Sequence, residues 1–199
     1  MLDYLIIGGG IAGISAAARL SEYGTTLVLE AEAHLAYHTS GRSAALYEQN
    51  YGSVSTVALA KAARADFDSM LSGVLSPRGF LLVCLQGEEA QFEYDLEHMH
   101  LSEIAVADAA KLVPILNSSS VIRTASSTTA HDIDTDMMLQ IFTRQIRANS
   151  GTVETNQQVT AINKTKRGWR VATESGQYEA QKIVNAAGAW GCLLYTSDA

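Results

Sequence analysis

The sequence contains little of what several classes of protein need. It has only two cysteines in 199 residues, Cys84 and Cys192, and they lie far apart with no CxxC or Cys/His spacing. This pattern predicts neither a disulfide framework nor a zinc site. We therefore expect free thiols in a reducing compartment and no bound metal.

Long apolar runs and positive charge are also scarce. No stretch reaches the roughly 18 uninterrupted apolar residues of a membrane helix. The apolar N-terminus carries Asp3, lacks a basic segment and is interrupted by glycines, which is not typical of a signal peptide. We expect a cytoplasmic protein with no integral membrane segment. The formal net charge of −7 argues against a nucleic-acid partner.

The sequence does contain a clear βαβ pattern at its start. Residues 3–7 form an apolar, β-branched run that glycines end, which predicts a buried strand. Residues 11–23 have apolar side chains at helical spacing and stop at Gly24. Residues 27–29 predict a second buried strand. The handedness of such units places the two strands side by side and parallel.

Four residues of this unit predict a dinucleotide site. Gly8, Gly10 and Gly13 form a GxGxxG turn between strand and helix, and Glu30 ends the second strand. The glycines allow a tight turn, close approach of a pyrophosphate and packing of helix on strand. The acid can accept hydrogen bonds from ribose hydroxyls and would repel the 2′-phosphate of NADP. NAD and FAD both remain possible on these residues alone.

The chain after Glu30 departs from a plain nicotinamide-binding pattern. A polar loop over 33–41 comes first, and the other elements that we expect before residue 134 are helices over 42–50, 54–71, 87–100 and 108–112 and a strand over 78–85. Asp134 and its neighbours predict the start of a further helix. That helix carries Met138, Phe142 and Ile146 on one face, which is typical of a core stripe.

The last part of the chain reads as strands. Residues 159–163 and 169–173 flank a polar turn and predict a hairpin. Residues 182–185 form an apolar strand followed by the tiny residues 186–189, which allow the backbone to approach a second part of a bound cofactor. The same pattern also fits a strand that simply ends in a turn.

Five segments together resemble the D-amino-acid oxidase-like family of FAD-dependent amine oxidoreductases, and most of all its D-amino-acid and D-arginine dehydrogenase branch. The segments are 3–13, Glu30, 37–45, 132–136 and 184–190. The resemblance implies an α/β fold, with a Rossmann-like FAD-binding βαβ core interrupted by part of an α+β substrate-binding domain and truncated at the C-terminus. The implied divisions are 1–52 and 151–190 for the FAD-binding core, 53–150 for the insertion and 191–199 for a tail.

The resemblance also implies FAD as the cofactor and two sets of residues that hold it. Those near the adenosine diphosphate are Gly8, Gly10, Ala12, Gly13, Glu30 and Val159. Those near the flavin or closing the site are Thr39, Arg42, Ser43, Ala44, Ala45, Leu46, Ala187, Gly188 and Trp190.

The implied substrate residues are fewer. Tyr51 matches an active-site tyrosine that can hydrogen-bond a substrate carboxylate or cover the flavin, and it is our candidate catalytic residue. Leu46 stands where the nearest relatives have a polar histidine, and Phe80 where a cation-selective relative has a carboxylate. These departures favour an apolar or neutral amine over D-arginine. We interpret His34 and His38 as hydrogen-bonded scaffold beside the cofactor.

The expected activity is oxidation of the C–N bond of a D-amino acid or related amine to an imine, which water hydrolyses to a keto acid and ammonia. The electron acceptor, which could be oxygen, a quinone or another protein, stays open. The alternatives are a flavin dehydrogenase of 2-hydroxy acids or glycerol phosphate, and a non-catalytic dinucleotide-binding module. Because the family is about twice as long and residues 192–199 resemble a translated sequencing adapter, we expect an artefactual tail and an unstable, inactive fragment.

Overall fold

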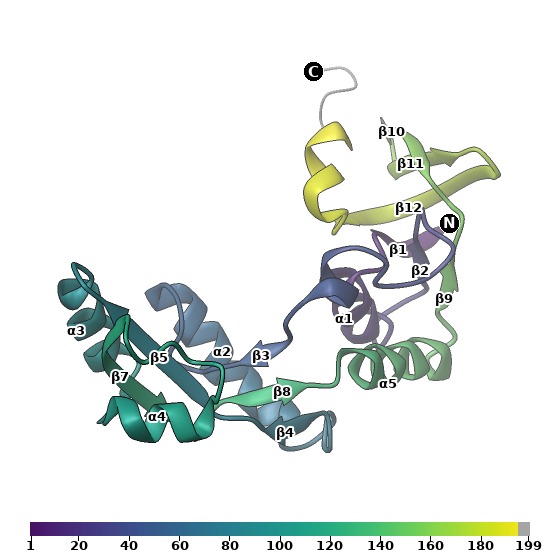
Figure 1. Ribbon diagram of the computed structural model, residues 1–199. Coiled ribbons are helices and arrows are strands. Elements are labelled where there is room, and N and C mark those ends of the chain that lie inside the picture. The colour runs from purple at the N-terminus through teal and green to yellow at the C-terminus, as the bar shows by residue number, and fades with distance from the viewer. Residues whose placement is uncertain (195–199) are drawn as a thin grey trace. The chain divides into compact units, whose positions relative to one another are not determined.

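The computed structural model describes residues 1–194 and divides into two compact units (Figure 1). The first unit contains residues 1–44 and the chain from Thr135 onward, and the second contains Ala45–Asp134. The α/β class with an interrupted Rossmann-like core is confirmed. The unit boundaries lie at 44/45 and 134/135, whereas the sequence suggested divisions after residues 52 and 150. Residues 195–199 of the expected tail lie outside the described residues.

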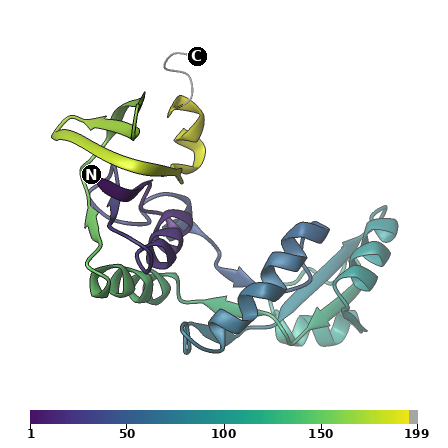
Figure 2. The ribbon, with the colours of Figure 1, turned by 180° about the vertical axis from the view of Figure 1, so that it is seen from behind.

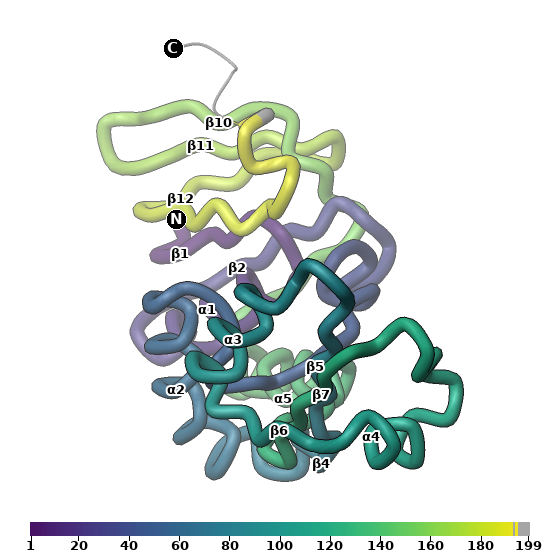
Figure 3. The backbone as a smooth tube through the Cα atoms, turned by 60° about the vertical axis from the view of Figure 1, so that its left-hand side comes forward, coloured from purple at the N-terminus to yellow at the C-terminus, as the bar shows by residue number. Residues whose placement is uncertain are grey.

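The first unit is built around one six-stranded sheet. Its elements are β1 (Leu2–Ile7), α1 (Ile11–Leu20), β2 (Thr26–Leu29), η1 (Thr39–Arg42), α5 (Thr135–Ala148), β9 (Thr152–Glu154), β10 (Val159–Thr165), β11 (Gly168–Thr173), β12 (Gly176–Asn185) and η2 (Gly188–Leu194). The strand order is β10-β11-β12-β1-β2-β9. Strand β1 pairs in parallel with both β2 and β12, so the predicted parallel βαβ unit is confirmed. Figure 3 shows β10, β11 and β12 running side by side beyond β1.

Burial of apolar side chains on both faces explains why β1 and β2 are strands. Leu5, Ile6, Val28 and Leu29 are at most 1% exposed. Each such side chain stabilises the fold by about 1.5–3 kcal/mol on burial. Side chains of β1 and β2 form an apolar cluster with Val171 of β11 and Ala180 of β12. Helix α1 packs on β1 and β2 and against α5. Helices α1 and α5 lie next to one another in Figure 2 as well.

Two predicted features of the first unit are confirmed at residue level. Met138, Phe142 and Ile146 of α5 are buried, as their spacing predicted. The hairpin forms with β10 and β11 antiparallel, and Lys164 pairs with Trp169 in its register. Helix α1 ends at Leu20, three residues earlier than expected, and Ser21 to Tyr23 form a turn instead.

The second unit contains two three-stranded sheets and three helices. Its elements are β3 (Leu46–Tyr47), α2 (Val54–Phe67), β4 (Leu75–Pro77), β5 (Phe80–Leu85), α3 (Glu89–His98), β6 (Ser102–Ile104), α4 (Val106–Leu112), β7 (Val121–Ser127) and β8 (His131–Ile133). The strand orders are β3-β8-β4 and β5-β7-β6. The sequence predicted β5, α2, α3 and α4. It did not predict the strands β3, β4, β6, β7 and β8.

The helix expected over residues 42–50 is wrong. The single turn η1 ends at Arg42, and β3 follows with Leu46 paired to Asp132 and Tyr47 to His131. Between them, Ala45 has a left-handed backbone with φ +52°, which ends any helix. Pairing with a distant strand, together with the hydrogen bond from Tyr47 Oη to the Ala60 carbonyl, outweighs local helix propensity here.

No helix among the described residues is long and apolar enough to span a membrane.

Candidate functional site

The turn between β1 and α1 requires glycine at two positions. Gly8 has φ +111°, and a Cβ there would collide with the carbonyl oxygen of Ala186. A Cβ on Gly13 would collide with the carbonyl oxygen of Gly8 and would come within 3.2 Å of Ile6 Cγ2. The glycines therefore bring the start of α1 against β1, and the end of β1 against the segment that follows β12.

This turn leaves backbone donors at the start of α1. The first amides of an α-helix have no intrahelical acceptor. The Ile11 amide donates to Ser40 Oγ at 3.0 Å. Within residues 1–194, the amides of Gly10, Ala12 and Gly13 donate to no protein acceptor. Such amides at the positive end of a helix dipole suit an anion such as a pyrophosphate.

The Glu30 carboxylate is fixed at the end of β2 by backbone amides. Its Oε2 accepts from the Gly9 amide at 2.5 Å, and its Oε1 accepts from the Glu32 amide at 2.9 Å. The backbone carbonyl of Glu30 accepts from the Gln157 amide at 2.8 Å, which joins the segment before β10 to this edge. Each carboxylate oxygen keeps a second lone pair with which it can accept from a hydroxyl group.

A cavity of about 430 Å³ lies over the glycine turn and Glu30. The loop between β2 and η1, the segment 157–159 and the segment 186–190 form its walls. Nine of the predicted cofactor-binding residues line it, namely Gly8, Gly10, Ala12, Glu30, Thr39, Val159, Ala187, Gly188 and Trp190. The structure thus brings together residues from four separate parts of the sequence.

The donor set of this cavity fits a dinucleotide. The free amides of Gly10 and Ala12 suit a diphosphate, the fixed Glu30 carboxylate suits ribose hydroxyls, and Gly10 lines the cavity without a side chain of its own. The amine-flavin family implied by the sequence uses such a ligand in FAD. Among the described residues, no group of three or more His, Cys, Asp or Glu side chains could hold a metal ion.

The other predicted cofactor-binding residues lie outside this lining. Gly13 is buried beneath the turn, and the Arg42 guanidinium lies over the Tyr37 ring, 5.1 Å from its centroid. Ser43 and Ala44 follow η1 in the first unit. The second unit contains Ala45, Leu46 and Tyr51, the candidate catalytic residue. Tyr51 is 61% exposed.

Among the lining residues that were not predicted to bind the cofactor, Ser40, His38 and Glu32 make polar contacts within the wall. Ser40 accepts the Ile11 amide, and His38 Nε2 lies 2.8 Å from Glu32 Oε1. The His38 ring also contacts the Trp190 ring, with centroids 4.3 Å apart. A hydrogen-bonded scaffold role for His38 agrees with this arrangement. Glu32 carried no sequence signal, because its role depends on a histidine six residues later in an irregular loop.

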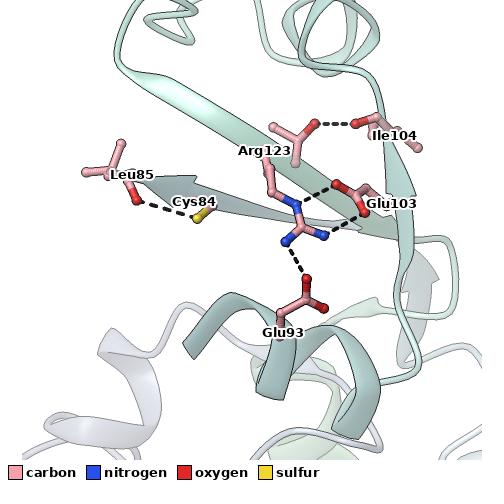
Figure 4. Close-up of polar contacts among 7 residues, drawn as sticks. Cys84, Leu85, Glu93, Glu103, Ile104 and Arg123 are labelled. Atoms are coloured by element: carbon pink, nitrogen blue, oxygen red, sulfur yellow. Dashed lines mark hydrogen bonds and ion pairs between the residues drawn. The ribbon is translucent and has the colours of Figure 1, made fainter. Parts of the chain in front are cut away.

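The second unit contains a polar network of its own (Figure 4). Arg123 of β7 forms a bidentate pair with Glu103 of β6, at 2.7 and 2.8 Å, and a further pair with Glu93 of α3. These hydrogen bonds lower the pKa of Glu103 below its usual value. Burial raises the pKa of the nearby Cys84 thiol, which keeps it protonated and unreactive. We therefore assign this network to the stability of the unit.

Comparison with known proteins identifies a family for almost the whole chain. A family model described as "DAO: FAD dependent oxidoreductase" matches residues 3–198. FAD is the cofactor of that family, which agrees with the donor set of the cavity.

Solved structures of several flavoenzymes share the fold. L-proline dehydrogenase from P. horikoshii aligns with a TM-score of 0.81 and 21% identity over 96% of this chain and 54% of its own. Glycine oxidase from Geobacillus kaustophilus aligns with a TM-score of 0.82 and 18% identity over 97% of this chain and 57% of its own. For the FAD-bound L-α-glycerophosphate oxidase from Mycoplasma pneumoniae the TM-score is 0.83 and the identity 20%, over 95% of this chain and 54% of its own. The chain thus spans little more than half the length of each.

Proposed function

We propose, from the premise that the chain belongs to the DAO family of FAD-dependent oxidoreductases, that it binds FAD for the oxidation of the C–N bond of an amino acid or related amine. In this reaction the substrate loses a hydride from Cα and a proton from nitrogen and becomes an imine. Water then hydrolyses the imine to a keto acid and ammonia. When bound, FAD supplies the acceptor for the hydride and its two electrons.

One observation carries the proposal. The free amides of Gly10 and Ala12 at the start of α1 and the fixed carboxylate of Glu30 face one cavity from the carboxyl ends of parallel strands. This edge is where open α/β sheets bind dinucleotides. The amides of Gly10 and Ala12 would hold the diphosphate, with Gly13 allowing the tight turn beneath them, and Glu30 would hold the adenosine ribose. Val159 would meet the adenine, and Ala187, Gly188 and Trp190 would close the site.

The substrate class that we favour is a D-amino acid with a neutral or apolar side chain. Phe80, in the position where a cation-selective relative has a carboxylate, packs against the apolar core of Cys84 and Phe92 in the second unit. Leu46 likewise offers no polar group. No acid at either position would pair with a guanidinium, and Tyr51 is the side chain that we assign to the substrate carboxylate.

Oxidation of 2-hydroxy acids or glycerol phosphate is the second candidate. The Mycoplasma pneumoniae L-α-glycerophosphate oxidase resembles this chain as closely as the two amine-directed enzymes do. A dinucleotide-binding module without catalysis is the third candidate. All three share the same cofactor cavity and differ in what reduces the bound flavin.

Titration with FAD, followed by flavin fluorescence and by absorbance after substrate addition, tests these candidates. We expect saturable binding of FAD and bleaching of the flavin band by neutral D-amino acids. Bleaching only by 2-hydroxy acids or glycerol phosphate would favour the second candidate, and bound flavin that no substrate bleaches would favour the third. No binding of FAD at any concentration would contradict the proposal.

The Glu30→Gln variant tests the role of the carboxylate. The amide side chain can no longer accept from two backbone amides and also from ribose hydroxyls, so we expect the Kd for FAD to rise about tenfold or more. Glu174→Gln is the matched control, because Glu174 is exposed in the turn after β11 and does not line the cavity. An unchanged Kd in Glu30→Gln would exclude Glu30 from the site.

A further inference from the structure

We propose that His38 is a positioning residue of the dinucleotide cavity, which joins two segments of its wall and, when protonated, strengthens binding of a diphosphate-bearing ligand. This inference rests on the proposed function. It concerns a histidine that was expected only to support the loop, and it assigns to that side chain a charge-dependent role in binding.

The geometry of the side chains places His38 between two walls of the cavity. Its Nε2 lies 2.8 Å from Glu32 Oε1, and both residues belong to the loop that follows β2. Its ring packs on Trp190 of η2 with a centroid distance of 4.3 Å and an interplanar angle of 43°. All three residues line the cavity. The imidazole is therefore the bridge between the loop after β2 and the segment after β12.

The neighbouring ring restrains the imidazole further. Tyr37 packs edge-on against His38 with a centroid distance of 5.0 Å, and the Arg42 guanidinium lies over the Tyr37 ring. The His38 side chain is about one-third exposed. A side chain that is held on three sides and partly shielded from water interacts more strongly with nearby charge than a free surface histidine does.

The charges near His38 give the direction of the effect. Glu32 and Glu30 are the acids that line the same cavity as His38, and Arg42 lies over the ring of Tyr37, the residue before His38. On α5, Asp136, Arg144 and Arg147 line a separate cavity with the other side of the loop. The dinucleotide cavity thus has two carboxylates on its wall, so a protonated His38 would neutralise Glu32 beside the diphosphate.

Protonation also strengthens the contact with the indole. An imidazolium ion in contact with an indole gains cation–π attraction that a neutral imidazole lacks, and the two rings here have centroids 4.3 Å apart. The same proton therefore tightens the bridge between the two segments and reduces the repulsion of a diphosphate. Both effects favour binding of a diphosphate-bearing ligand when the imidazole is protonated.

Binding of FAD and of ADP-ribose to the full chain at pH 8 and pH 6 tests this inference. ADP-ribose carries the adenosine diphosphate without the flavin, and its diphosphate does not titrate between these values. We expect the Kd of both ligands to fall about three- to tenfold on acidification. Adenosine, which has no phosphate, is expected to bind with the same Kd at both values.

One variant and one control assign the effect to His38. His38→Gln keeps a hydrogen bond to Glu32 but cannot become charged, so its Kd is expected to be independent of pH. His34→Gln is the control, because His34 is an exposed histidine in the same loop that does not line the cavity. The inference is overturned if His38→Gln keeps the pH dependence, or if the unmodified chain binds FAD equally well at both values.

The fluorescence of Trp190 measures the contact itself. The chain has two tryptophans, so Trp169→Phe leaves Trp190 as the sole indole. Protonated imidazole quenches a stacked indole, and we expect Trp190 emission to fall on acidification only where His38 is present. Emission that does not change with pH, in a chain that binds FAD, would overturn the inference alone. Failure to bind either dinucleotide at any pH would overturn the proposed function and this inference with it.

Discussion

The two units of the molecule use similar helices in different ways. Helices α2 and α5 both contain 14 residues, yet α5 has five buried side chains and α2 has none. Leu59 of α2 is 71% exposed, and Phe67 of the same helix is only half-buried where it contacts the Tyr47 ring. Apolar spacing therefore predicts a helix in both units, but burial requires a partner surface, which α1 of the first unit provides for α5.

The largest expected effect separates the two helices directly. Ile146→Ala removes a fully buried side chain from α5 and is expected to lower the free energy of unfolding by about 2–5 kcal/mol. Leu59→Ala in α2 is the matched change and is expected to stay within about 0.5 kcal/mol. Urea unfolding followed by far-UV circular dichroism reports on both units, and the fluorescence of the two tryptophans, which both belong to the first unit, reports on that unit.

The comparison would fail if the two changes had equal effects. In that case α2 would be packed as tightly as α5, and far-UV circular dichroism would lose helical signal at the same urea concentration in both variants.

The same contrast explains how much of the fold the sequence could predict. Strong local signals, such as the apolar run of β1 and the glycine turn after it, predicted the core of the first unit. Strand β7 was missed because only Val121, Thr124 and Ala125 of its seven residues are buried, and small or polar side chains carry a weak strand signal. Its identity as a strand depends on pairing with β5 and β6, which local patterns do not encode.

The site could be predicted in part for the same reason. The glycine turn and Glu30 have fixed spacing, so the sequence was sufficient to propose them. Ser40, Glu32 and His38 lie in an irregular loop, and their contacts arise only when the loop folds back over the turn, as the hydrogen bond from the Ala36 amide to the Gly9 carbonyl illustrates. The roles of Tyr51 and of the residues after Arg42 stay predictions.

The close packing of the first unit can also be tested at a single glycine of the turn between β1 and α1. Gly13→Ala would place a methyl group against the carbonyl oxygen of Gly8, where backbone rather than a flexible side chain must move. We expect a loss of about 1–3 kcal/mol in stability and a weaker affinity for FAD, because the amides of the turn would shift. Tryptophan fluorescence during urea unfolding and FAD titration measure the two effects.

Gly176→Ala is the control for this change. A Cβ on Gly176 meets nothing within 4 Å, and the residue lies in the same unit at the start of β12. Its stability and its Kd for FAD are expected to match those of the unmodified chain. If Gly13→Ala matched this control in stability and in Kd, the turn would tolerate a side chain and its close packing would not matter.

The smallest expected effect concerns the polar network of the second unit. Hydrogen bonds from Arg123 lower the pKa of Glu103 below its usual value of 4.5. A carboxyl group with a lowered pKa in the folded state contributes stability above its unfolded pKa and loses it as the pH falls through the folded value. We expect Glu103→Gln to be less stable than the unmodified chain at pH 7, and the difference to disappear as the pH falls through the lowered pKa of Glu103 in the folded state. Amide exchange of β7 measures this in the second unit.

Glu97→Gln provides the reference, because Glu97 is an exposed acid of α3 in the same unit whose side chain forms no hydrogen bond or ion pair among the described residues. Its exchange rates are expected to follow those of the unmodified chain at every pH. If Glu103→Gln stayed less stable at pH 3 by the same margin as at pH 7, the network would act through packing of the side chain rather than through its charge. The second unit would then depend on apolar contact as the first one does, and the contrast between the units would be one of degree.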